Sequence, residues 1–205
     1  MNNSPHPDVN TFKISDLRPT QMTLGMREVE SKRREWRDLK PNKDGTFLGH
    51  HSVPVIIGPK KRIFLIDHHH LCRALLEEGV NEVLVQTVQN LSWLKKEEFW
   101  EFMEIKRWVH PFDENGHRLE FKQLPKTIMA MVDDPYRALA GAARQNGAFA
   151  KEPTPFAEFA WANFLRARIK RNMVENDFES SLKLAKKLCQ SSDARYLPGW
   201  CGIEE

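Results

Sequence analysis

A carboxylate, three consecutive histidines and an arginine lie within seven positions of one another, and they are Asp67, His68, His69, His70 and Arg73. Carboxylates and imidazoles exchange protons or bind metal ions near neutral pH, and a guanidinium pairs with phosphate oxygens. The group follows a short apolar segment at 63–66, and a helical pattern continues from it to Gly79. Asp67 is a typical N-cap, so a helix is expected over 68–78. Because unpaired N–H groups and the positive end of the dipole meet at a helix start, the 67–73 turn is predicted to bind a phosphate.

Three chemical interpretations of this group remain open. Adjacent helical positions lie about 100° apart around the axis, so the three histidines cannot all bind one metal ion. Asp67 with one or two imidazoles could form a metal site, helped by His50 or His51 from the preceding segment. Alternatively, imidazole N–H groups and Arg73 surround an oxyanion, while Asp67 orients a histidine or holds a Mg²⁺ ion that accompanies a nucleotide. In the third interpretation Asp67 only caps the helix and the histidines are solvated.

The segments around the 67–73 turn predict a compact mixed α/β (α+β) unit with a small sheet. A Gly-Pro turn with three basic residues separates two β-branched runs and predicts a hairpin. The expected strands are residues 11–15, 53–57, 63–66 and 82–88. Helices are expected where apolar side chains recur at helical spacing, at residues 26–39, 68–78 and 95–108.

The second half of the chain has a helical pattern. Helices are expected at residues 125–132, 135–145, 155–171 and 178–188. Phenylalanines at helical spacing in this half are interpreted as core, not as a cofactor site. The predicted organisation is a flexible tail at 1–10, an α/β domain at 11–110 and a C-terminal helical region at 111–205 packed on it.

Composition indicates a globular protein. With 31 basic and 28 acidic residues the net charge is +3, which does not indicate a dedicated nucleic-acid binder but leaves a local basic patch open. The chain has no run of about 18 apolar residues, and its N-terminus lacks a secretory pattern, so a cytoplasmic protein without membrane contact is expected. The 3 cysteines form no CxxC pair, and Cys72 is expected to be a buried, unreactive thiol.

The order of these elements, with the sequence LIDHHHLCRAL, resembles the ParB/sulfiredoxin superfamily, and more closely its branch named "putative ParB-like nuclease". The later stretches DDPYRALAGAARQNGAF and TPFAEFAWANFLRARI resemble the same branch, so the similarity spans residues 9–175. It implies a ParB/sulfiredoxin-like fold in which the turn after the hairpin binds phosphates. ParB proteins bind and hydrolyse CTP, sulfiredoxin uses ATP, and the related free-serine kinases phosphorylate a small molecule.

The resemblance also implies roles for individual residues of the turn. Asp67, His69 and His70 match the aspartate and paired histidines of the kinase motif. His68 stands where that motif has glycine, and its side chain would narrow the approach of a phosphate to the backbone. Leu71 stands where the motif has arginine, and Arg73 is expected to supply the missing guanidinium from the next turn.

Further candidates precede the hairpin. Glu28, with Glu30 behind it, corresponds to the glutamate that serves the kinases as base. The remaining candidates for phosphate or nucleotide binding are Thr20, Gln21 and Lys32. On the residues alone, Glu28 and Lys32 are better explained as an ion pair one helical turn apart. Beside the phosphate site that the resemblance implies, they become candidates for the base and for a phosphate ligand.

Three functions follow as hypotheses. The first is an enzyme that transfers or hydrolyses a phosphate ester of a nucleotide at the 67–73 turn, with Mg²⁺ and ATP or CTP, and with a nucleotide or small phosphorylated molecule as substrate. The second is a metal-dependent nuclease acting on DNA or RNA through the same residues. The third is a non-catalytic nucleotide- or DNA-binding module. The sequence shows no run in which Lys and Arg alternate with aromatic residues, and it leaves the oligomeric state open.

Overall fold

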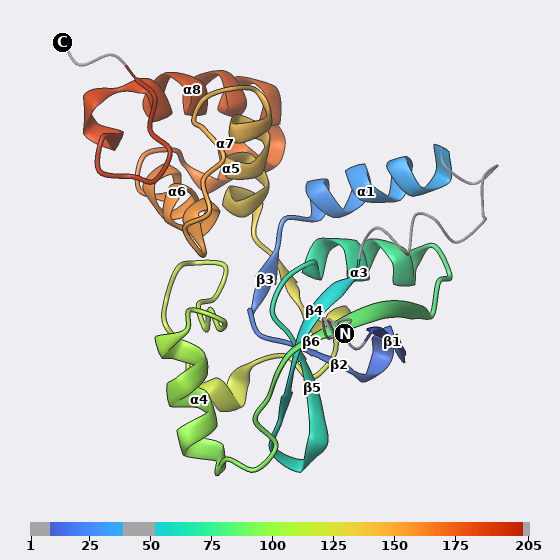
Figure 1. Cartoon of the computed structure of the whole chain (residues 1–205). Coiled ribbons are helices and arrows are strands. Elements are labelled where there is room, and N and C mark those ends of the chain that lie inside the picture. The colour runs from blue at the N-terminus through green and yellow to red at the C-terminus, as the bar shows by residue number, and fades with distance from the viewer. Residues whose placement is uncertain (1–8, 39–51, 203–205) are drawn as a thin grey trace, which may run out of the picture. The chain divides into compact units, whose positions relative to one another are not determined.

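The computed structural model describes residues 9–38 and 52–202 (Figure 1). His50 and His51, the additional candidates for a metal site, lie outside these residues, as does most of the predicted tail. The chain divides into two compact units. The first contains the described parts of Met1–Met22, Val29–Pro111 and Leu119–Met131. The second contains those of Thr23–Glu28, Phe112–Arg118 and Val132–Glu205.

The first unit is built on a mixed five-stranded sheet in the order β1-β6-β4-β5-β2 (Figure 1). Its strands are β1 Val9–Lys13, β2 Leu17–Pro19, β4 Val53–Gly58, β5 Arg62–Leu65 and β6 Glu82–Asn90. The predicted hairpin is confirmed, because β4 and β5 pair antiparallel, whereas β4 pairs parallel with β6 and β5 pairs parallel with β2. The helices of this unit are α3 His69–Glu77, α4 Lys96–Ile105 and most of α1 Met26–Asp38. The fold class predicted from the sequence, a small mixed sheet with helices, is therefore confirmed.

Close packing of the hairpin against α4 depends on Gly58. A Cβ atom at this position would lie 2.6 Å from the ring of Phe64 and 2.8 Å from that of Phe99. These two rings are buried, with centroids 4.8 Å apart, in a core that also contains Ile56 and Met103. The Gly-Pro turn therefore both reverses the chain and lets aromatic side chains approach the backbone.

One face of α3 is buried in the first unit. Leu71, Cys72 and Leu75 are between 0% and 4% exposed. The prediction that Cys72 is buried is confirmed, and burial raises the pKa of its thiol to about 12.

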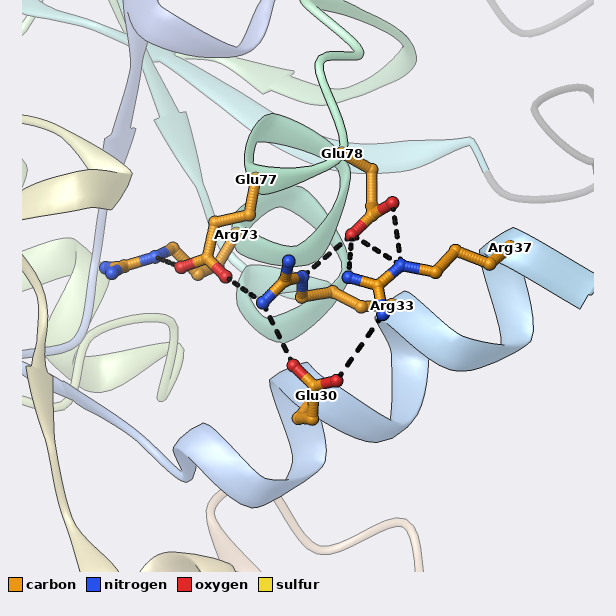
Figure 2. Close-up of polar contacts among 6 residues, drawn as sticks. All are labelled: Glu30, Arg33, Arg37, Arg73, Glu77 and Glu78. Carbon is orange, nitrogen blue, oxygen red and sulfur yellow. Dashed lines mark hydrogen bonds and ion pairs between the residues drawn. The ribbon is translucent and has the colours of Figure 1, made fainter.

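The opposite side of α3 is joined to α1 by ion pairs, which Figure 2 shows. Arg33 lies 2.9 Å from Glu30, 3.1 Å from Glu77 and 2.9 Å from Glu78. Arg37 adds a contact of 2.6 Å to Glu78. Glu30, the candidate behind Glu28, is thus part of a structural network that ties two helices together.

The second unit is mainly helical. It contains α5 Pro135–Gln145, α6 Ala157–Arg166, α7 Arg171–Asn176 and α8 Phe178–Gln190, with a short parallel pair formed by β3 Thr23–Leu24 and β7 Val132–Asp133. Its core is packed around Trp161, which stacks on Phe149 at a centroid distance of 4.1 Å. The bounds predicted for α5 are confirmed.

Two helix predictions in the C-terminal half are wrong. Residues 125–132 form a short 3₁₀ turn at Ile128–Ala130 and then enter β7, because Val132 pairs with Thr23 of β3. Residues 155–171 are not one helix, since α6 ends at Arg166 and α7 begins at Arg171. Of the helices that the structure describes, none has the length and apolar character needed to cross a membrane.

Candidate functional site

The 67–73 turn connects β5 to α3, but the helix starts one residue later than predicted. His69 is its first residue, and the N-cap is His68 instead of Asp67. The Asp67 carboxylate accepts a hydrogen bond of 2.7 Å from the backbone N–H of His68. Asp67 is exposed, whereas His69 and His70 are buried. Of residues 67–70, Asp67 and the partly exposed His68 are therefore the ones that solvent or a ligand can reach.

His68 has a left-handed backbone conformation, with φ of 63° and ψ of 24°. This conformation costs an L-residue roughly 1–2 kcal/mol, whereas glycine adopts it freely. Position 68 is also the one at which the resemblance places a glycine. A glycine would adopt the conformation observed at His68 without this steric cost.

His69 holds the loop before α1 in place. Its Nε2 accepts a hydrogen bond of 3.2 Å from the backbone N–H of Thr20, and the hydroxyl of Thr20 donates to the carbonyl of Leu65 at 2.7 Å. Burial and, to a smaller extent, the neighbouring His70 lower the pKa of His69 to about 3, so the imidazole is neutral at pH 7. A neutral ring whose Nε2 already accepts a hydrogen bond organises the turn. It does not present a positive charge to a phosphate.

Thr20 and Gln21, predicted to bind phosphate or nucleotide, are only 1% and 7% exposed. Thr20 is held by His69 and Leu65, and Gln21 forms a β-bridge with His110. Both residues lie in the loop that supports the 67–73 turn, and their side chains are buried.

The guanidinium of Arg73 already has protein partners. Its Nε lies 2.6 Å from Glu77, and its Nη1 donates to the carbonyls of Ile128 and Met129 at 3.4 and 3.2 Å. The Arg73 side chain is 14% exposed. These contacts link the 128–130 turn to α3, and the carboxylate of Glu77 neutralises the charge of Arg73.

Glu28 and Lys32 do not form the alternative ion pair. The Glu28 carboxylate belongs to the second unit and lies 3.3 Å from Nη1 of Arg137. Lys32 forms no ion pair with any residue in the described ranges 9–38 and 52–202. Arg137 is buried and also pairs with Glu158, so Glu28 is one carboxylate of a charged cluster inside the second unit.

A second charged contact in this unit was missed by sequence reasoning. Asp134 is 1% exposed, caps α5 by accepting from the N–H of Tyr136 at 2.9 Å, and lies 2.6 Å from Arg166. Burial raises the pKa of Asp134 despite this arginine. The Asp-Pro pair before α5 is a cap signal that could have identified its structural role.

Within the described part of the chain, no three His, Cys, Asp or Glu side chains are grouped as a metal ion would require. A Mg²⁺ ion near Asp67 would therefore need phosphate oxygens of a ligand to complete its coordination.

Residues 10–167 match the family described as "Putative ParB-like nuclease", and the chain belongs to this family. The predicted membership in this branch is thereby confirmed. The chain is also similar to protein Atu1540 from Agrobacterium tumefaciens, whose crystal structure superposes with a TM-score of 0.90. The two sequences are 49% identical, and the match covers 97% of this chain and 100% of that one. A search of curated proteins found no match.

Proposed function

We propose that the first unit carries out phosphate-ester chemistry on a nucleotide at the 67–73 turn, by phosphoryl transfer or hydrolysis with Mg²⁺ and ATP or CTP. The observation that carries this proposal is the left-handed His68 beside the exposed Asp67, at the start of the nine-residue helix α3. Strained backbone positions that a fold retains cluster at binding and catalytic sites. The description of the chain's family names nucleases, which cleave phosphate esters, and this supports chemistry on a phosphate ester.

The proposal assigns the roles to groups of the first unit. The phosphate lies at the start of α3, where the helix dipole favours an anion. Asp67 binds the Mg²⁺ that accompanies the nucleotide or orients the attacking group, and His68 donates a hydrogen bond to a phosphate oxygen. His69 acts indirectly, by holding Thr20 and the loop beneath the turn.

A thermal-shift panel with ATP or CTP, each with and without Mg²⁺, tests this proposal. We expect the parent protein to be stabilised by a nucleotide with Mg²⁺, by about 2.7 kcal/mol at a hundred times the Kd. Asp67→Asn should lose this stabilisation, and Asp16→Asn, the same change at an exposed residue of the first unit, should keep it. Released phosphate or a phosphorylated product would establish turnover. Binding without any turnover in the parent would instead identify a non-catalytic nucleotide-binding module, and no stabilisation by any nucleotide would refute the proposal.

A nuclease acting on DNA or RNA is the second candidate, and the description of the family favours it. Cleavage of plasmid DNA or of a labelled oligonucleotide with Mg²⁺, abolished in Asp67→Asn and unaffected in Asp16→Asn, would favour this candidate over the first.

A further inference from the structure

A cavity of about 200 Å³ in the first unit brings together five cationic side chains. They come from β2, β5, the first residue of α4 and the 122–126 segment, and they are Arg18, Arg62, Lys96, Lys122 and Lys126. The remaining lining residues are proline, leucine and aromatic side chains, and none is acidic. We call this site the cationic cavity. It does not include any residue of the 67–73 turn.

Most of the charge in the cationic cavity is not neutralised by the protein. Lys122 pairs with Glu120 at 2.8 Å. Among the described residues, the other four cations form no ion pair. Partial burial, together with repulsion from the nearby guanidinium of Arg62, lowers the pKa of Arg18. Lys96 opens α4, where the helix dipole disfavours a cation. Burial, charge repulsion and the helix dipole all disfavour these positive charges, so their presence together indicates an anionic ligand.

Aromatic rings form a wall of the cationic cavity. Trp100 and Phe121 are partly exposed and stack with ring planes 10° apart and centroids separated by 5.1 Å. Phe64 and Phe99, which are buried, pack against Trp100 at 5.4 and 5.0 Å and keep its ring in position. Rigid aromatic surfaces between basic side chains are the arrangement on which unpaired bases stack while the phosphates contact the cations.

We propose that the cationic cavity binds one nucleotide unit of a single-stranded nucleic acid, with its base against the aromatic wall and its phosphates beside Arg18, Arg62 and Lys96. The cavity is smaller than the 300–1,000 Å³ of typical small-molecule sites, so it encloses only part of its ligand, and the neighbouring units of a strand would extend outside it. Because its lining has no carboxylate, it offers no protein ligand for the Mg²⁺ of a nucleoside triphosphate. A duplex keeps its bases stacked on each other and would leave the aromatic wall unused.

Fluorescence anisotropy with a labelled single strand of about 12 nucleotides, as DNA and as RNA, tests this inference. Arg62→Gln/Lys96→Gln changes two exposed residues of the cavity, so the fold should be retained. We expect its affinity to fall by about tenfold or more. The slope of log K against log salt should become shallower by about 1.4, which corresponds to two fewer phosphate contacts. An abasic strand of equal length should bind the parent about tenfold more weakly, because the stacking energy is lost.

Lys13→Gln/Arg34→Gln is the matched control, since it removes one Lys and one Arg that are exposed in the first unit and do not line the cavity. Its affinity should stay within about twofold of the parent. An equal loss in this control would overturn the inference, because the binding would then depend only on overall charge. The inference would also be overturned if an abasic strand or a duplex bound as tightly as the intact single strand. Displacement of the strand by micromolar mononucleotide, or no binding at about 50 mM salt, would overturn it as well. Asp67→Asn should bind the strand normally, so this inference and the proposed chemistry at the 67–73 turn can fail separately.

Discussion

His69 is the residue for which the structure changes the interpretation most. Its neutral ring accepts a hydrogen bond from Thr20, and its pKa of about 3 lies below the value of 6.5 expected in the unfolded chain. As the pH falls, the imidazole is protonated in the unfolded chain before it is protonated in the folded chain. The contribution of the neutral ring to the free energy of unfolding is therefore complete above pH 6.5 and decreases as the pH falls towards 3. Between pH 6.5 and 5 the loss should be about 2 kcal/mol.

His69→Gln tests this pH dependence, because an amide can accept from Thr20 but does not titrate. Urea unfolding at several pH values should show a smaller loss of free energy between about pH 6.5 and 5 than in the parent. An unchanged pH profile in the variant would show that His69 is not the group responsible.

His68 allows the function of a side chain to be separated from the effect of its backbone. His68→Gly keeps the positive φ and removes the steric cost, so the free energy of unfolding should stay equal or rise by up to about 1 kcal/mol. Stabilisation by nucleotide with Mg²⁺ should nevertheless decrease, since the imidazole is lost. Lys60→Gly is the control, because Lys60 is exposed and has a φ of 59° in the hairpin turn. If His68→Gly retained the full response to nucleotide, His68 would have no part in binding.

At the scale of elements, Glu78, the residue that follows α3, pairs with both Arg33 and Arg37 of α1 (Figure 2). Hydrogen bonds from Arg37 and then Arg33 lower its pKa from 4.5 to about 2. A carboxylate with a depressed pKa stabilises the fold above its unfolded value and loses that contribution as the pH falls, here between 4.5 and 2. Glu78→Gln should therefore lower the free energy of unfolding at pH 7. In urea unfolding, that free energy should also depend less on pH below 4.5 than it does in the parent. Glu82→Gln, at an exposed residue, should leave that profile unchanged.

The elements that could be predicted from the sequence carry local signals. A Gly-Pro turn joins β4 to β5 and a proline opens α5, and the hairpin and the bounds of α5 were both predicted correctly. The 125–132 segment has apolar residues but takes its conformation from the pairing of Val132 with Thr23, which are 109 positions apart. The cationic cavity combines Arg18, Arg62, Lys96 and the 122–126 segment, so no window of the sequence contains enough of it to be noticed. Burial of His69 is likewise a property of the loop at Thr20, and it cannot be read from three adjacent histidines.

At the scale of the whole molecule, each compact unit has a hydrophobic core among its described residues. Leu139 is fully buried in the core of the second unit. Leu139→Ala should therefore cost about 2–5 kcal/mol, and hydrogen exchange should accelerate in α5 and α8 more than in β4 and β6. The cationic cavity is lined only by residues of the first unit, so at about 10 °C this variant should bind a single strand with the affinity of the parent. The variant could instead lose strand binding while hydrogen exchange in β4 and β6 stays slow. Residues of the second unit would then be needed for binding, and the assignment of the ligand to the cavity alone would be wrong.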